Sequence, residues 1–341
     1  MTALLPHTSP AAPYARDGHS VDLSRVHALT RSQLVEVEAQ LRNLPDLQPE
    51  ALREAVIHIV AAGGKRLRPA ITVLVAGLFS RADDRRVIDL ASAVEMLHTA
   101  TLVHDDLIDG SLMRRGAQTL NAVWTPAATV LTGDYLFAYA ANLAARTQNT
   151  HVMSIFADTL SVIVAGELQQ QFTDFALRAT REDYYRRIYS KTASMFVLAT
   201  TACGVLCEAN AAQLEALRAY GHDLGLAFQI MDDVLDFTGD VREVGKPVGS
   251  DLRRGLITLP VICYIETHGK DGLECALQGR CAPEAYDAII TRIRHSDAIQ
   301  RAIEEAQQLG QRARAALTGF PPSPYRDALM DLVDYTLART H

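Results

Sequence analysis

Two acidic triplets of the same form, Asp-Asp-x-x-Asp, are the residues in this sequence best suited to chemistry. They are Asp105, Asp106 and Asp109, and Asp232, Asp233 and Asp236. On a helix, residues four apart lie on one face with their Cβ atoms about 5–6 Å apart. Each triplet therefore directs two carboxylates the same way, and such a pair repels unless a cation lies between its members. Hard carboxylate oxygens favour Mg²⁺, which binds one or two carboxylates together with the phosphates of a substrate.

A single triplet of this form is often only the solvated acidic face of a helix. Here there are two, far apart in the chain, and each lies among Leu, Ile, Val, Met or Phe. Two solvent-exposed helix faces that share this motif by chance explain the repetition poorly. The two triplets therefore predict a site that binds a metal ion and a polyphosphate.

Composition limits the class of protein. The chain has 341 residues, of which 48% are hydrophobic, and it can bury a substantial core. Its formal net charge of −7 argues against nucleic acid as a partner, because binding a phosphate backbone requires a basic face. The five cysteines are an odd number without CxxC spacing, and we predict buried thiols in a reducing compartment. These cysteines are Cys203, Cys207, Cys263, Cys275 and Cys281.

Helical periodicity dominates the sequence, and clear strand alternation is absent. Helices are predicted at 51–60, 88–107 and 151–175, the last two buried because they are hydrophobic on more than one side. A capping box at 180–183 predicts the start of another helix, and Ser323-Pro324 predicts the start of the final one. The uncharged stretches 116–133 and 192–207 are too short or too interrupted to span a membrane, so we expect buried core.

The elements are expected to form one domain. Gly and Pro mark helix boundaries and nowhere form a long linker. Residues 1–20 are rich in Pro, Ala, Ser and Thr and predict a flexible extension without a secretory signal. The prediction is a single all-α domain over residues 21–341 in a soluble, cytoplasmic protein. The two triplets would then lie on facing helices of one bundle.

Basic clusters accompany the triplets. The segment Gly63-Gly-Lys-Arg-Leu-Arg-Pro69 places Lys65 and Arg68 three residues apart, on one face of a helix start. The pair Arg114-Arg115 follows the first triplet closely, and Lys191 and Lys246 add further donors. A basic cluster alone is usually a solvated patch. Together with two Mg²⁺-type triplets, these residues are the expected phosphate ligands.

The ordered set of motifs resembles the all-trans polyprenyl diphosphate synthases, especially the long-chain octaprenyl and solanesyl type. The set runs from about Ala51 to the end of the chain. It comprises GGKRLRP, HDDxxDxxxxRRG, Gly133-Asp134, Lys191-Thr-Ala193, FQxxDDxxD, Gly245-Lys246 and Thr258-Leu-Pro260. The resemblance implies an all-α bundle around a deep apolar cavity. It also implies a homodimer that condenses isopentenyl diphosphate with an allylic diphosphate, with at most peripheral membrane contact for product release.

The resemblance assigns a role to each candidate residue. Three Mg²⁺ ions would be held by Asp105, Asp109 and Asp232, supported by Asp106, Asp233 and Asp236. The allylic diphosphate would be bound by Arg114, Lys191 and Lys246. The diphosphate of isopentenyl diphosphate would be bound by Lys65, Arg68, His98 and Arg115. The developing carbocation would face Thr192, Gln229 and the carbonyl of Lys191. For His98, a buried and hydrogen-bonded core histidine is the alternative.

Two further expectations concern specificity. Leu256 stands where the family often has Lys, so a cation for the allylic diphosphate is missing from that position. Ala100 and Thr101 lie just before the first triplet, where short-chain members commonly have aromatic residues, and Met96 and Leu97 lie one turn further back. An open cavity beside them predicts a hexaprenyl-to-decaprenyl product. Alternatively, Ala100 only permits close helix packing.

The sequence leaves three alternative functions open. A short-chain synthase would make farnesyl or geranylgeranyl diphosphate. A non-catalytic subunit of a heteromeric synthase would be expected to have lost ligands that are intact here. A terpene cyclase would not need the cluster assigned to isopentenyl diphosphate.

Overall fold

The computed structural model describes residues 23–44, 50–61, 64–114, 116–172, 180–239, 248–278 and 280–339. Two predicted diphosphate ligands, Arg115 and Lys246, lie outside the described residues, as does the predicted extension over residues 1–20.

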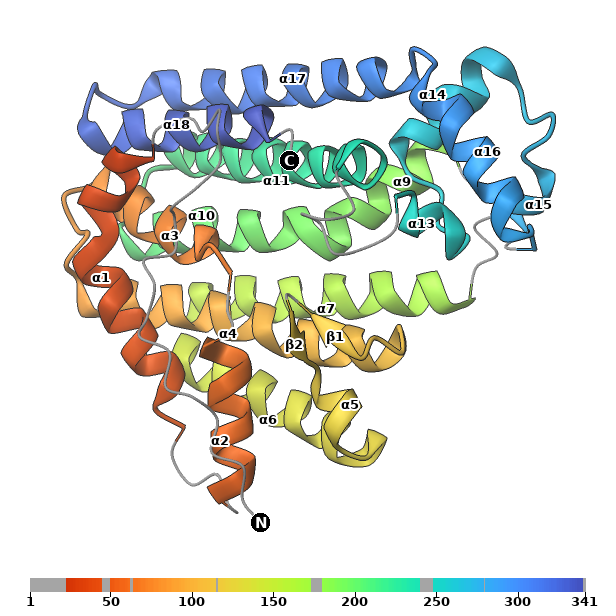
Figure 1. Cartoon of the computed structure of the whole chain (residues 1–341). Helices are drawn as coiled ribbons and strands as arrows, with labels where there is room; N and C mark the ends of the chain where they lie inside the picture. Colours follow the sequence, from red (N-terminus) through yellow and green to blue (C-terminus); the bar gives the residue numbers. More distant parts are fainter. Residues whose placement is uncertain are drawn as a thin grey trace.

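Helices make up most of the described chain (Figure 1). The first half contains α1 (Ser24–Arg42), α2 (Glu50–Ala61), α3 (Leu67–Gly77), α4 (Arg85–Ile108), β1 (Met113–Arg114), β2 (Ala117–Gln118), α5 (Leu120–Val123), α6 (Pro126–Ala145) and α7 (Thr150–Phe172). The second half contains α9 (Arg181–Ile188), the π-helix η1 (Tyr189–Ala193), α10 (Ser194–Leu206), α11 (Ala211–Thr238), α13 (Ser250–Arg253), α14 (Leu259–His268), α15 (Glu274–Leu277), α16 (Pro283–Arg294), α17 (Ala298–Ala316), the 3₁₀ turn η2 (Leu317–Gly319) and α18 (Pro324–Ala338).

Capping residues fix where the site-bearing helices begin. The Asp84 side chain accepts a hydrogen bond from the Arg86 amide at the start of α4. At the start of α9, the Thr180 side chain accepts from the Asp183 amide. These bonds satisfy amides that have no partner within the helix. The starts of α9 and α18 and the helices α2 and α4 confirm the sequence predictions.

The bundle is built around α10, which contacts α3, α4 and α7 on one side and α11 on the other. In Figure 1, α7, α10, α11 and α17 run side by side across the molecule, and α14–α16 lie at one end. Both α4 and α10 are buried over most of their length, as predicted. The arrangement brings the C-terminal end of α4, the π-helix before α10 and the C-terminal half of α11 to one end of the bundle.

One short element was not foreseen, and two expectations about local structure are wrong. A two-stranded hairpin pairs β1 with β2 directly after the first triplet, where no strand was predicted. Two cysteines, Cys275 and Cys281, are joined by a disulfide across a short loop, whereas the other three are free and buried as expected. The stretch 116–133 was expected in the core, but Val123, Val130 and Leu131 are exposed.

The predicted burial of α7 is also wrong. This helix is long and apolar enough to cross a membrane by length and composition, yet only 22% of its apolar window is buried. Val164, Leu168 and Phe172 are exposed, Phe172 by 86%. Hydrophobic periodicity indicates that a surface avoids water, but it does not show whether the same chain or something else covers it.

Candidate active site

The first triplet lies at the C-terminal end of α4 and faces basic side chains from elsewhere in the chain. Asp105 Oδ2 lies 3.3 Å from Lys191 Nζ. The guanidinium of Arg254 donates from Nη1 to Asp109 Oδ2 at 3.2 Å. Burial raises the pKa of Asp105, and Lys191 opposes that effect.

Asp106, the middle residue of the first triplet, is buried and does not face the same partners. Arg114 Nε donates to both of its carboxylate oxygens, at 2.8 and 3.0 Å. Arg114 belongs to β1, so this pair holds the hairpin against the end of α4. The contact with Asp106 therefore places Arg114 beside the first triplet.

A π-helix carries Lys191 and Thr192. Single π-turns inside α-helices are often found at functional sites. Lys191 Nζ donates to Glu167 of α7 at 2.9 Å. The approach of α7 depends on Gly166, because a Cβ there would lie 2.5 Å from Ser190 Cβ. Burial alone would lower the pKa of Lys191, but Asp105 and Glu167 together raise it, so the side chain stays charged.

Asp232, the first residue of the second triplet, pairs with an arginine that follows α18. Arg339 Nη2 lies 2.7 Å from Asp232 Oδ1, and its guanidinium also lies over the Phe228 ring, 4.4 Å from the centroid. The surrounding protein raises the pKa of Asp232, and Arg339, Arg68 and Lys65 lower it. These interactions place Lys65 and Arg68, two of the predicted ligands of isopentenyl diphosphate, on the Asp232 side of the site.

Asp233 and Gln229 belong to a chain of hydrogen bonds that crosses from α11 to η1. Thr192 Oγ1 donates to Gln229 Oε1 at 2.7 Å, and Gln229 Nε2 donates to Asp233 Oδ1 at 2.9 Å. Tyr184 donates to the other oxygen of Asp233 at 2.7 Å. Burial, with Asp251 nearby, raises the pKa of Asp233 to about 7. Thr192 and Gln229, predicted to act together, are in direct contact.

Asp236 holds the start of α13. Its Oδ1 accepts from the amide and the hydroxyl of Ser250, at 3.0 and 2.7 Å, and its Oδ2 accepts from the Asp251 amide at 3.2 Å. These bonds tie α13 to the second triplet. The next turn carries Arg254, which reaches Asp109. Asp236 therefore positions a residue that contacts the first triplet.

The GGKRLRP segment is anchored by its middle arginine. Arg66 is buried in a left-handed backbone conformation and donates to Glu95 at 2.8 Å and to the Val60 carbonyl at 2.6 Å. With Arg66 fixed, Lys65 lies against Tyr335 and Arg68 lies over the Phe196 ring, each 5.0 Å from the ring centroid.

The remaining predicted residues lie on α4, one to three turns before Asp105. His98 is partly exposed, and its carbonyl accepts from Thr101 Oγ1 at 2.8 Å. The four residues assigned to product length, Met96, Leu97, Ala100 and Thr101, are buried.

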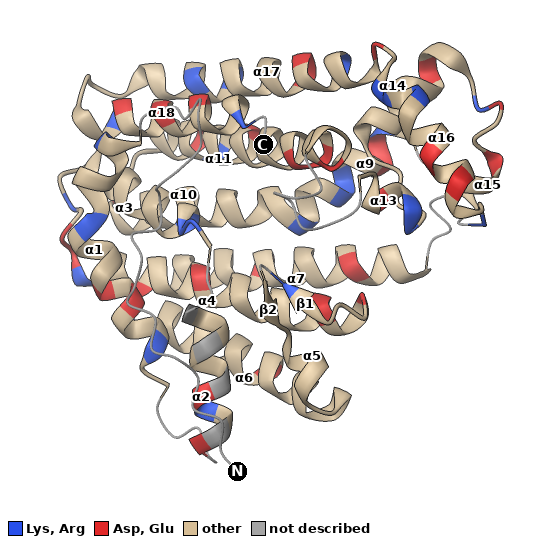
Figure 2. Cartoon of the chain, in the orientation of Figure 1, with Lys and Arg blue, Asp and Glu red and all other residues tan. Residues whose placement is uncertain are grey.

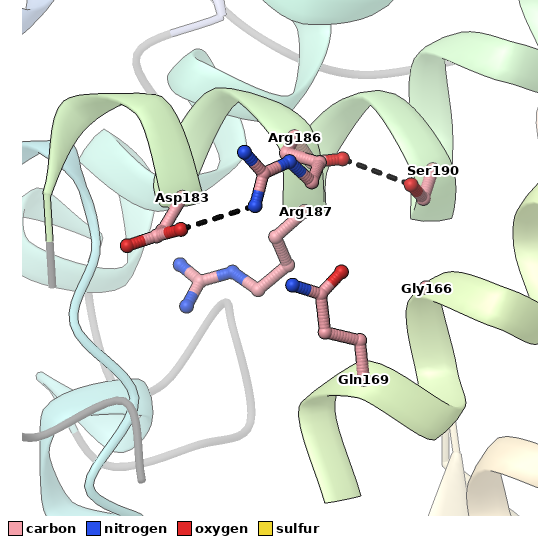
Figure 3. Close-up of a pocket in the computed structure, with 6 residues that line it drawn as sticks. All are labelled: Gly166, Gln169, Asp183, Arg186, Arg187 and Ser190. Atoms are coloured by element: carbon pink, nitrogen blue, oxygen red, sulfur yellow. Dashed lines mark hydrogen bonds and ion pairs between the residues drawn. The ribbon is translucent and has the colours of Figure 1, made fainter. Parts of the chain in front are cut away.

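A small pocket lies elsewhere, between α7, α9 and η1. Figure 3 shows the Arg187 and Gln169 side chains directed into it. Burial lowers the pKa of Arg187, which donates to the Ile257 carbonyl at 2.6 Å. None of the product-length residues lines this pocket.

Each predicted metal ligand thus carries a basic partner: Asp105 with Lys191, Asp109 with Arg254 and Asp232 with Arg339. Acidic positions on α11 and basic positions near α9 and α13 lie at the same end of the bundle (Figure 2). Within the described ranges, no three acidic, histidine or cysteine side chains gather closely enough to hold an ion alone. This donor set suits Mg²⁺, which takes one or two carboxylates and completes its shell with phosphate and water.

Sequence reasoning missed three residues of this site. Glu167 had a signal, since it is one of two acidic residues in the apolar α7. The doublet Arg253-Arg254 was visible, but nothing in the sequence singled out its second member. Arg339 had no signal.

The fold and the comparisons with known proteins together define the chain as a prenyltransferase with the all-α isoprenoid synthase fold. The chain belongs to the polyprenyl synthetase family, whose model matches residues 49–291.

Relatives and solved structures agree with this assignment. The chain is 32% identical over 323 residues to the octaprenyl diphosphate synthase of Escherichia coli (strain K12), covering 94% of this chain and 99% of that one. It is 33% identical over 327 residues to the chloroplastic solanesyl-diphosphate synthase 2 of Oryza sativa subsp. japonica, covering 94% and 80%. A crystal structure of polyprenyl synthase from Caulobacter crescentus CB15, complexed with calcium and isoprenyl diphosphate, superposes with a TM-score of 0.88 at 34% identity. That match covers 95% of this chain and all of the other.

Proposed function

We propose that the chain joins isopentenyl diphosphate to an allylic diphosphate, repeatedly and with Mg²⁺, to make a long all-trans polyprenyl diphosphate. The observation that carries the proposal is a continuous path of contacts between the two acidic triplets. It runs from Asp105 through Lys191 and its neighbour Thr192 to Gln229 and Asp233. The triplets thus form one site with basic side chains from at least four elements.

Mg²⁺ would be held by Asp105, Asp109 and Asp232, and we propose three ions per site. Asp109 and Asp232 each keep 36% of their side-chain surface exposed. Asp109 pairs with Arg254 and Asp232 pairs with Arg339, so an ion can replace the arginine at each carboxylate. Bound there, Mg²⁺ supplies positive charge for the departing diphosphate. The similar structure from C. crescentus is complexed with calcium and isoprenyl diphosphate, which supports a divalent ion as part of the proposal.

The basic side chains would bind the two diphosphates. Arg114 and Lys191 lie on the Asp105 side of the site, where they suit the allylic substrate, and Lys246 is proposed with them. On the Asp232 side, Lys65 and Arg68 suit isopentenyl diphosphate, with His98 and Arg115 proposed as further contacts. Arginine binds phosphate through a planar fork and lysine as a point charge.

The proposed reaction separates charge between the departing diphosphate and the allylic carbon. The allylic carbon–oxygen bond breaks, and its electron pair leaves with the diphosphate. The double bond of isopentenyl diphosphate supplies the electrons of the new carbon–carbon bond, and a proton passes to the departed diphosphate. Thr192 and Gln229 present oriented dipoles to the allylic cation, and Asp233 and Tyr184 keep the Gln229 amide from rotating.

We propose a hexaprenyl-to-decaprenyl product. The buried residues Ala100 and Thr101 precede Asp105 by five and four positions on α4 and are small, and Met96 and Leu97 lie one turn further back. Small or flexible side chains here let neighbouring groups move aside as the product grows. The octaprenyl and solanesyl synthases among the relatives support a long product.

We further propose a homodimer in the cytoplasm, with at most peripheral membrane contact during product release. The surface that a second copy would cover consists of the exposed apolar residues of α6, α7, the end of α4, and the segment after α4 that includes β1 and α5. These residues are Ile108, Leu112, Met113, Val123, Val130, Leu131, Val164, Leu168 and Phe172. Large apolar side chains exposed to water favour association. Size-exclusion chromatography with light scattering tests the dimer, and Leu168→Asp should yield monomers.

The direct test incubates the purified chain alone with isopentenyl diphosphate, farnesyl diphosphate and Mg²⁺, and sizes the products by mass spectrometry. Products of six to ten prenyl units are expected, and EDTA should abolish them. Termination at farnesyl or geranylgeranyl diphosphate would contradict the long product. No product without a second protein would favour the subunit of a heteromeric synthase.

A further inference from the structure

Arg254 connects the two walls of the site. It follows α13, which Asp236 fixes to the second triplet through Ser250 and Asp251. From there its guanidinium donates to Asp251 Oδ1 at 3.0 Å and to Asp109 Oδ2 at 3.2 Å, across 145 residues of sequence. One basic side chain is thus shared between a carboxylate of its own turn and a predicted metal ligand on α4.

The preceding residue, Arg253, has different partners. Arg253 Nε donates to the Val248 carbonyl at 3.2 Å, its Nη2 pairs with Asp287, and its guanidinium lies 5.8 Å from the centroid of the Tyr286 ring. Its partners belong to α16 and to its own loop, away from both triplets. Arg253 and Arg254 therefore carry the same side chain in different surroundings, which makes Arg253 a matched control for Arg254.

The Arg254 guanidinium is bound directly to Asp109 and therefore competes with any metal ion that uses this carboxylate. When an ion binds, repulsion between like charges moves the guanidinium off Asp109. The contact with Asp251 remains, so the guanidinium stays within the site beside the position that a metal-bound diphosphate would take. Leu256 lies in the same turn, where its amide donates to the Asp251 carbonyl at 2.9 Å, and its side chain brings no charge.

We propose that Arg254 is a binding residue for the diphosphate of the allylic substrate, exchanging Asp109 for the diphosphate when the divalent ion binds. It thereby supplies the positive charge that Leu256 lacks. The inference rests on the proposed function, because it requires an allylic diphosphate at the first triplet.

The test compares Arg254→Gln with wild type, with Arg254→Lys as the charge-conserving variant and Arg253→Gln as the matched control. Isothermal titration calorimetry measures the Kd of farnesyl thiolodiphosphate, a non-reacting allylic analogue, with Mg²⁺ present, and separately the Kd of isopentenyl diphosphate. Loss of a charge-assisted hydrogen bond predicts that Arg254→Gln binds the analogue about 10- to 100-fold more weakly. Arg254→Lys should recover part of this loss. Arg253→Gln should match wild type, and the affinity for isopentenyl diphosphate should not change.

A second measurement examines the exchange itself. Binding of Mn²⁺ without diphosphate, followed by electron paramagnetic resonance, should be tighter in Arg254→Gln than in wild type, because the competing cation is gone. Weaker Mn²⁺ binding would overturn the exchange.

The possible results separate this inference from the proposed function. If wild type binds the analogue and Arg254→Gln binds it equally well, the inference is wrong and the proposed function stands. Equal weakening of both substrates together with lower thermal stability would make Arg254 a structural clamp and overturn the inference. If wild type itself does not bind the analogue with Mg²⁺, the proposed function fails.

Discussion

Gly225 allows α11 to approach η1 closely, and replacing it tests whether this approach positions the reacting groups. A Cβ at position 225 would lie 2.6 Å from Ala193 Cα and 2.8 Å from Ala193 Cβ. Carbon atoms in contact prefer about 3.5–4.0 Å, so Gly225→Ala requires the two helices to separate by roughly 1 Å. One turn further along α11, the 2.7 Å bond from Thr192 to Gln229 would then be too long to persist.

The expected effects on stability and turnover differ in size. Overpacking costs about 1–3 kcal/mol, and the better helix propensity of Ala offsets about 1 kcal/mol, so the free energy of unfolding should fall by about 0–2 kcal/mol. Misplacing a positioning group by about 1 Å can lower turnover on the order of 100-fold. Urea unfolding measures the first effect, and kcat at saturating substrates and Mg²⁺ measures the second.

Gly204→Ala is the matched control. A Cβ there would lie 2.7 Å from Leu217 Cδ1 and 3.0 Å from Leu214 Cδ2, so it also crowds the contact between α10 and α11. Those atoms are the ends of flexible side chains at the other end of the contact. This variant should lose some stability but little kcat. If Gly225→Ala kept the wild-type kcat, close approach of α11 to η1 would not be what positions Gln229.

Three further predictions follow from other parts of the molecule. Lys65→Ala should raise the Kd of isopentenyl diphosphate and Arg114→Ala that of the allylic substrate, each by about 10- to 100-fold; calorimetry showing equal effects on both substrates would defeat the assignment. Ala100→Phe should shorten the product while sparing the first condensations. Products of unchanged length by mass spectrometry would contradict the assignment of Ala100 to product length. A hydrogen bond from Arg181 lowers the pKa of Glu266 below its ordinary 4.5, so this pair stabilises the fold above that pH and the stabilisation disappears as pH falls. Glu266→Gln should therefore cost up to about 1 kcal/mol at pH 7 and less near pH 4, and urea unfolding that gives the same loss at both pH values would refute this.

Much of the site could be predicted because its signals are local. The spacing within each triplet, the cap at Thr180 and the periodicity of α4 each depend on residues only a few positions apart. The family resemblance predicted that Thr192 and Gln229 both face the allylic carbocation, which stays a prediction, and the hydrogen bond between them was not foreseen.

The partners of the metal ligands could not be predicted in the same way. The contacts of Arg254 with Asp109 and of Arg339 with Asp232 join segments more than one hundred residues apart. Such pairs depend on how the helices pack, and no spacing in the sequence encodes them. The exposure of α7 escaped prediction for a related reason, because an apolar helix has the same periodicity whether its own chain or another surface covers it.

The central claim is that the two acidic triplets act together in one metal-dependent site. The most direct test measures turnover of Asp105→Ala and Asp232→Ala at saturating Mg²⁺, with circular dichroism to confirm that each variant is folded. Because each substitution removes a ligand for the ion that neutralises the departing diphosphate, each variant should lose on the order of 100-fold or more in kcat. Near-normal turnover in either folded variant would contradict the claim.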